Sequence, residues 1–138
     1  YKGECNGAVV YDDYCHHPTE IRATVGGARE LYPDRRLVIA FQPHTYSRTK
    51  GLFDEFAKAL GLADKMFVLP IYAAREENTS GVSSRELAVK TLEYNQQAEY
   101  VDSVEAAVNR LRSELTDQDV LVVMGAGDVT KVAAELTA

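Results

Sequence analysis

The chain has 138 residues, of which 46% are hydrophobic and 26% are charged, and its formal net charge at pH 7 is −6. This length predicts one domain with a core of its own, and the acidic balance argues against a dedicated nucleic-acid surface. No apolar run approaches the roughly 20 residues of a membrane span. No secretion leader is visible, and two cysteines are too few for a disulfide framework, so we expect a cytoplasmic protein. Because the first residue is not Met, we also expect a fragment.

The expected elements alternate between strands and helices. In the first half, apolar patterning predicts strands over 7–12, 36–41 and 65–71 and helices over 18–32 and 51–60. The polar stretch 42–49 is expected to be a loop. Gly26 and Gly27 lie inside the first expected helix, and we attribute these small residues to close packing on the sheet.

The second half continues this alternation after a polar segment over 72–82. Ser83 and Glu86 have the spacing of a capping box, as do Asp102 and Glu105, so each pair predicts the start of a helix. Short strands are expected over 99–101 and 120–124, and a final helix follows 125–128. The pattern predicts an α/β, three-layer Rossmann-like fold, with a mostly parallel sheet of five to six strands and helices on both faces.

The turn after the first strand concentrates chemically active side chains. Asp12, Asp13, Tyr14, His16 and His17 lie within six positions, and ligands of open parallel sheets bind at the carboxyl ends of strands. The structural alternative is that an Asp caps the next helix, with His17 beside its N-cap. We expect no metal site, because adjacent histidines point in different directions and no other ligand cluster has a familiar spacing.

Polar turns also follow other expected strands. The loop over 41–50 carries His44, Arg48 and Lys50, which suit an anionic ligand, although Ser47 or Thr49 could simply cap the next helix. The charge-rich segment 72–78 would lie on the same rim.

The turn after the last strand, Gly125–Ala126–Gly127–Asp128, lets backbone approach a ligand, but Asp128 could equally be an N-cap. A single GxG is weak evidence for a dinucleotide site. The sequence contains no GxxxxGK[ST] loop. If this domain acts on a nucleotide, another domain must hold the phosphates.

Five segments of the sequence resemble the C-terminal domain of the Mur ligases, ATP-dependent amide-bond-forming enzymes of peptidoglycan synthesis. They cover residues 12–21 (DDYCHHPTEI), 41–49 (FQPHTYSRT), 72–76 (YAARE), 81–83 (GVS) and 124–128 (MGAGD). The resemblance implies that residues 1–138 are the third, lid domain, and that the UDP-binding and central ATP-binding domains are absent. It implies a ligase that joins L-alanine to UDP-N-acetylmuramate through an acyl phosphate, with ATP and Mg²⁺ held mainly by the central domain.

The same resemblance implies roles for individual residues. Asp13 would bond the ATP ribose beside Tyr14, and His16 would line the nucleotide and amino-acid side of the cleft. His44 and Arg48 would face the incoming alanine and the transferred phosphoryl group. The turn expected near the alanine carboxylate consists of Gly125, Ala126, Gly127 and Asp128.

Two other interpretations stay open. One is a sister ligase that attaches a tripeptide to the same sugar, although its corresponding loop lacks the Gln-Pro-His core found here at 42–44. The other is a non-catalytic, nucleotide-binding α/β module. A GxxxxGK[ST] loop encoded upstream in the same reading frame would favour a ligase over a binding module.

Overall fold

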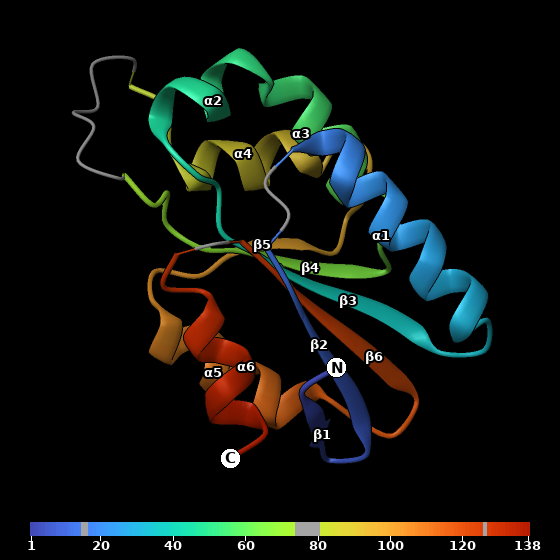
Figure 1. The fold of residues 1–138 in the computed structure, drawn as a ribbon. Coiled ribbons are helices and arrows are strands. Elements are labelled where there is room, and N and C mark those ends of the chain that lie inside the picture. Colours follow the sequence, from blue (N-terminus) through green and yellow to red (C-terminus); the bar gives the residue numbers. More distant parts are fainter. Residues whose placement is uncertain (15–16, 74–80, 126) are drawn as a thin grey trace.

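A six-stranded sheet separates two layers of helices in the computed structural model, which describes residues 1–14, 17–73, 81–125 and 127–138 (Figure 1). The strands are β1 (Gly3–Cys5), β2 (Ala8–Asp13), β3 (Arg36–Phe41), β4 (Lys65–Val68), β5 (Ala98–Tyr100) and β6 (Asp119–Met124). The helices are α1 (Pro18–Leu31), α2 (Tyr46–Gly51), α3 (Phe53–Leu60), α4 (Ser84–Thr91), α5 (Val104–Glu114) and α6 (Thr130–Leu136).

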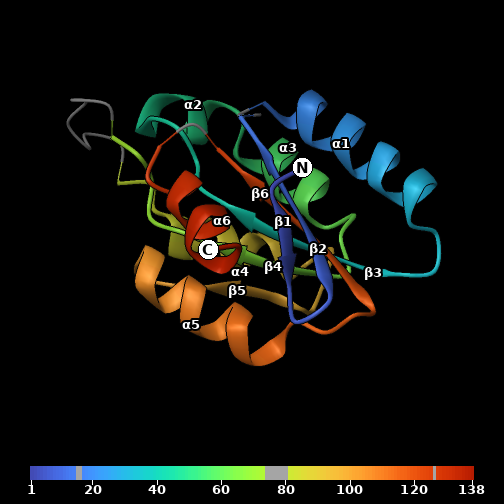
Figure 2. The ribbon, with the colours of Figure 1, turned by 60° about the horizontal axis from the view of Figure 1, so that its bottom comes forward.

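The strand order is β1-β2-β6-β3-β4-β5. The β1–β2 pairing is antiparallel, and the β2–β6, β6–β3, β3–β4 and β4–β5 pairings are parallel. Helices α1, α3 and α4 cover one face, and α5 and α6 cover the other (Figure 2). The expected fold class is therefore confirmed.

Burial on both faces explains why β3 is a nearly continuous apolar run. Leu37, Ile39 and Phe41 join the core beneath α1, α3 and α4, whereas Val38 and Ala40 join the core beneath α5 and α6. Successive side chains of a strand point to opposite faces, so a strand covered on both sides must be apolar at every position.

Several predicted boundaries were wrong. Strand β1 was missed, and the expected loop over 42–49 contains the start of α2. The helix expected over 51–60 is α3, which begins two residues later, because Gly51 ends α2 and Leu52 separates the two helices. The strand expected over 65–71 ends at Val68, since Pro70 has no N–H with which to continue the ladder.

The helix caps were predicted with mixed success. Ser83 does cap α4, accepting a hydrogen bond from the Glu86 N–H. The cap of α5 is Ser103, not Asp102. His17 is itself the N-cap of α1, and its Nδ1 accepts from the Thr19 N–H. Asp128 caps nothing, because the N-cap of α6 is Val129.

The sequence predicts that the two glycines of α1 pack closely on the sheet, and this prediction is wrong. A Cβ added at Gly26 or Gly27 would meet no atom within 4 Å. Both positions are exposed. Close packing therefore does not account for them.

Replacing Gly26 by Ala should raise the free energy of unfolding by about 0.5–1 kcal/mol, because Ala favours the helix and space is open. Urea unfolding of the chain measures this change. Gly125→Ala is the control: Gly125 has φ +138°, and its added Cβ would lie 2.7 Å from Val129 Cγ1, so stability should fall. A destabilised Gly26→Ala variant would contradict the open environment.

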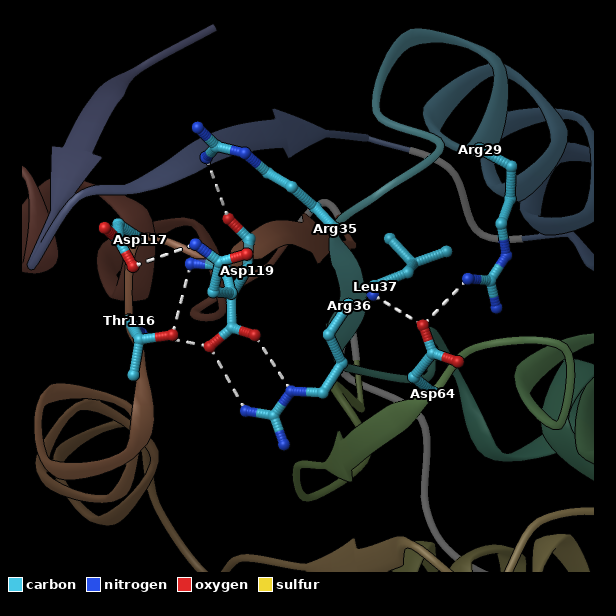
Figure 3. Close-up of polar contacts among 9 residues, drawn as sticks. Arg29, Arg35, Arg36, Leu37, Asp64, Thr116, Asp117 and Asp119 are labelled. Atoms are coloured by element: carbon cyan, nitrogen blue, oxygen red, sulfur yellow. Dashed lines mark hydrogen bonds and ion pairs between the residues drawn. The ribbon is translucent and has the colours of Figure 1, made fainter.

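A charged clamp joins β3 to β6 at the amino ends of the strands (Figure 3). The Arg36 guanidinium donates from Nε to Asp119 Oδ1 at 2.9 Å and from Nη2 to Oδ2 at 3.2 Å. Asp119, only 2% exposed, also accepts from the Thr116 N–H. The carboxylate raises the pKa of Arg36 mainly through these hydrogen bonds, against the opposing effect of burial. The clamp holds Arg36 and Asp119 as register partners.

Asp64 makes a second polar junction at the same edge (Figure 3). Its Oδ2 accepts from Arg29 Nη1 at 2.8 Å and from the Leu37 N–H at 2.7 Å. Partial burial acts to raise the pKa of Asp64, but these hydrogen bonds and nearby arginines outweigh it, so the pKa is lowered. The ionised carboxylate therefore links α1, β3 and the segment before β4.

Asp119→Ala should lower the free energy of unfolding by about 2 kcal/mol, because it leaves the Arg36 guanidinium and the Thr116 N–H without their acceptor. Chemical denaturation compares it with Asp117→Ala, which removes a neighbouring exposed carboxylate and should cost less than about 0.5 kcal/mol. Equal losses of unfolding free energy in the two variants would show that the ion pair between Arg36 and Asp119 does not stabilise the fold.

Asp64→Asn should cost about 0.5–1 kcal/mol at neutral pH, a surface-pair value, because both Asp64 and Arg29 side chains are 40% exposed. The folded pKa of Asp64 is depressed, so its contribution is present above the unfolded pKa and lost as pH falls through the folded pKa. The stability difference between the two proteins should therefore be constant near neutral pH and shrink as pH falls below about 5. A difference independent of pH would contradict this.

Candidate functional site

The carboxyl ends of β2, β6 and β3 lie side by side. Asp13 and Phe41 both align with Met124 across the ladders. Beyond the strands, the Gly125 N–H donates to the Asp13 carbonyl at 2.9 Å, and the Gln42 N–H donates to the Met124 carbonyl at 3.0 Å. The turns that follow these strands therefore form one rim, as the sequence predicted.

The first part of the rim is the end of β2. The Asp13 carboxylate accepts a hydrogen bond from Thr24 Oγ1 at 2.8 Å, which ties the end of the strand to α1. Tyr14 is 66% exposed. His16, expected to line the cleft, lies outside the described residues. Asp13 is thus oriented by α1 while Tyr14 is accessible to a ligand.

Asp12 differs from its neighbour in environment. Its Oδ1 is buried and makes no hydrogen bond within the described part of the chain. Burial raises the pKa of Asp12; Lys2 opposes this rise, and the Asp13 carboxylate adds to it. The Asp12 carboxyl therefore binds a proton more readily than an ordinary Asp.

His44 is positioned by the segment that follows β4. Its ring stacks on Tyr72, with centroids 5.6 Å apart and an interplanar angle of 24°. The backbones pair as well: the Thr45 N–H donates to the Tyr72 carbonyl, and the Tyr72 N–H donates to the Pro43 carbonyl, each at 2.8 Å. The two loops thus act as one support for the imidazole.

Arg48 lies in the first turn of α2. The helix is capped by Thr45, whose Oγ1 accepts from the Arg48 N–H at 3.3 Å, so neither Ser47 nor Thr49 is the cap. Thr45 adopts φ +62° and ψ 148°, a strained conformation for a residue with a side chain. The Arg48 guanidinium is half-buried, and its Nη1 makes no hydrogen bond to any described residue. That donor could serve an anionic ligand.

The turn after β6 is shaped by its neighbours. Gly125 has φ +138°, where side chains are rarely tolerated. A Cβ at Gly127 would lie 2.6 Å from the Tyr72 ring and 2.8 Å from Gln42 Oε1. Asp128 is exposed, and Ala126 lies outside the described residues. Gly125 is therefore required by its positive φ and by the close Val129 side chain, and Gly127 is required by the close Tyr72 and Gln42 side chains.

A cavity of about 320 Å³ opens at this rim. It is lined by Gln42, Leu69, Pro70, Ile71, Tyr72, Ala73, Asp102, Ser103, Val104 and Asp128. A second hollow of about 250 Å³ lies between α1 and β2, with Asp13 and Thr24 among its lining residues. The charge-rich stretch expected over 74–78 falls outside the described residues. Of the predicted site residues, Asp128 lines the first cavity and Asp13 lines the second, whereas His44 and Arg48 line neither.

Sequence reasoning gave no role to three residues that build the rim. Thr24 orients Asp13, Tyr72 stacks on His44, and Gln42 contacts the last turn. Tyr72 and Gln42 stood inside recognised motifs, which was the available signal. Thr24 is an ordinary helix residue in the sequence, and its contact arises only from packing.

No group of three or more His, Cys, Asp or Glu side chains among the described residues could hold a metal ion. No helix in the same ranges is both long and apolar enough to cross a bilayer.

Comparison with known proteins defines the class. Residues 1–127 match the family model described as "Mur ligase, glutamate ligase domain". The chain therefore belongs to the Mur ligase family. The described fold agrees, since solved members of this family superpose on it closely.

One curated relative and one solved structure are similar to most of this chain. The UDP-N-acetylmuramate–L-alanine ligase of Lachnospira eligens is 49% identical over 135 residues, 98% of this chain and 29% of that protein. The UDP-N-acetylmuramate-alanine ligase of Thermotoga maritima superposes with a TM-score of 0.73 at 25% identity, covering 92% of this chain and 26% of that one.

A domain of a Haemophilus ducreyi protein assigned as a UDP-N-acetylmuramate:L-alanyl-gamma-D-glutamyl-diaminopimelate ligase also superposes well. The TM-score is 0.71 at 25% identity, and the match covers 99% of this chain and 94% of that domain. The chain thus spans less than a third of the curated relative it matches, but nearly all of a domain that was solved by itself.

Proposed function

We propose that this chain is the C-terminal lid domain of a cytoplasmic UDP-N-acetylmuramate–L-alanine ligase. The full-length enzyme would use ATP to activate the lactyl carboxylate as an acyl phosphate, which the amine of L-alanine then attacks. The observation that carries this proposal is the convergence of Asp13, His44 and Gly125 on one rim, in a chain 49% identical to a curated ligase of that name.

The proposal divides the work between domains. Without a GxxxxGK[ST] loop, this chain would leave the phosphates of ATP and Mg²⁺ to the central domain. Asp13 and Tyr14 would contact the nucleotide, the former through the ribose. His16 would line the same side of the cleft.

The remaining rim groups would face the reacting atoms. Negative charge gathers on the acyl phosphate and on the tetrahedral intermediate formed from it, and positioned donors stabilise such charge best when water is excluded. The half-buried Arg48 guanidinium and His44 would supply those donors. The turn Gly125–Ala126–Gly127–Asp128 would receive the alanine carboxylate through its backbone.

The alternative is the tripeptide-attaching ligase. It is kept because the domain from Haemophilus ducreyi has a similar fold. Its 25% identity equals that of the Thermotoga maritima alanine ligase, whereas the alanine ligase of Lachnospira eligens reaches 49%. Phosphate release by the full-length protein, with UDP-N-acetylmuramate and ATP, should depend on L-alanine and not on the tripeptide. The reverse preference would replace the proposal by this alternative.

The 138-residue chain alone should release no phosphate in an alanine-dependent manner, because the phosphate-holding half of the cleft is absent. The full-length enzyme assayed in parallel is the positive control. Alanine-dependent turnover by the isolated chain would show that the division of work proposed above is wrong.

In the full-length enzyme, Arg48→Ala should lower kcat at least ~100-fold, the scale of losing one donor to a transition-state anion. Arg112→Ala is a matched control: its backbone carbonyl accepts from Asn6 in the β1–β2 turn, at the end of the sheet remote from the rim. Steady-state kinetics of both variants should show a loss only for Arg48→Ala. An unchanged rate would remove Arg48 from the mechanism.

A further inference from the structure

Gln42 is a buried amide at the meeting point of three chain segments. Its side chain leaves the end of β3 and is only 5% exposed as a residue. Nε2 donates to the Pro70 carbonyl at 3.1 Å, and Oε1 accepts from the Val129 N–H at 3.1 Å. One side chain thus joins the exit of β3, the exit of β4 and the N-cap of α6.

The chemistry of these partners dictates an amide. The Val129 N–H can only donate and the Pro70 carbonyl can only accept, so the bridging group must present both an acceptor and a donor. A carboxylate would satisfy Val129 but place an acceptor against the Pro70 carbonyl. An apolar side chain of the same shape would leave both backbone groups unsatisfied, and α6 has no capping side chain at its own N-cap.

The amide also sets the space available to the last turn. A Cβ on Gly127 would lie 2.8 Å from the amide Oε1, whereas a Cβ on Gly125 would meet the backbone of the same residue, 3.0 Å from the main-chain carbonyl oxygen of Gln42. On its other side, the bond to Pro70 fixes the segment that leads to Tyr72, the ring stacked on His44. Displacing this amide would therefore move both supports of the rim.

We propose that Gln42 is a positioning residue, which aligns the Gly125–Asp128 turn with His44 without touching the substrate. This inference rests on the proposed function for its kinetic consequence, although the alignment itself can be measured independently. Misplacement of binding groups by about 1 Å can cost up to ~100-fold in rate, so loss of two buried hydrogen bonds at this junction should be visible in catalysis.

The test compares Gln42→Met with wild type in the full-length enzyme. Met is similar in shape but makes neither hydrogen bond, so the KM for L-alanine should rise about tenfold. The KM for UDP-N-acetylmuramate should stay within about twofold, because that substrate is assigned mainly to another domain. A merely structural role would reduce the active fraction, and hence kcat, with the KM for L-alanine unchanged; that result would overturn the proposal.

Gln118→Met is the matched control, since Gln118 is exposed and lies beside Asp117 at the opposite end of β6. It should leave both KM values unchanged. If Gln42→Met does not fold, Gln42→Asn keeps a neutral amide with a donor and an acceptor but sets them one methylene back, and it should raise the KM for L-alanine by a smaller factor. A wild-type KM for this variant would also overturn the proposal.

Hydrogen exchange of the full-length protein separates this inference from the proposed function. Gln42→Met should speed deuterium uptake in peptides covering Val129 and Tyr72, whether or not the enzyme uses L-alanine. Faster uptake in a wild-type background that shows no alanine-dependent turnover would reject the proposed function but keep the positioning role. Unchanged uptake would reject the positioning role alone.

Discussion

The register between β3 and β6 is the constraint on which the rim depends. Arg36 pairs with Asp119 at one end of this ladder and Phe41 pairs with Met124 at the other. The bidentate ion pair at the amino end thus acts on the same alignment that places the polar turns at the carboxyl end (Figure 3). A slip of one residue would turn every side chain of β3 to the opposite face, so that Leu37, Ile39 and Phe41 would exchange cores with the smaller Val38 and Ala40.

The rim itself is assembled mainly by backbone and buried groups. Backbone bonds join Gly125 to Asp13 and Tyr72 to the segment around His44, while the Gln42 amide connects the β3 and β4 exits to α6. The proposed site residues therefore lie on segments that hydrogen bonds within the chain hold together. Such preorganisation is what electrostatic stabilisation of a reaction requires.

The sequence predicted what depends on local pattern and missed what depends on distant contacts. The buried run 36–41 and the convergence of polar turns follow from hydrophobicity and from parallel topology. Helix α2 was missed because its cap, Thr45, needs an unusual backbone conformation that no propensity indicates. The hydrogen bonds of the Gln42 side chain could not be predicted, since its partners lie 28 and 87 residues away. Gly26 was misinterpreted because composition does not distinguish an open helix face from a packed one.

The proposed chemistry also explains why the rim is open to water. Tyr14 is 66% exposed and Asp128 is exposed, so the isolated rim could not shield an acyl phosphate from hydrolysis. A guanidinium such as Arg48 stabilises developing charge far better once solvent is displaced, because the local dielectric falls. Under the proposed function, the same closure that brings a second domain onto this rim would assemble the donors and expel the water. Under this proposal, the exposed polar edge allows a second domain to close on the rim, and the hydrogen-bonded supports keep the donors in position when it does.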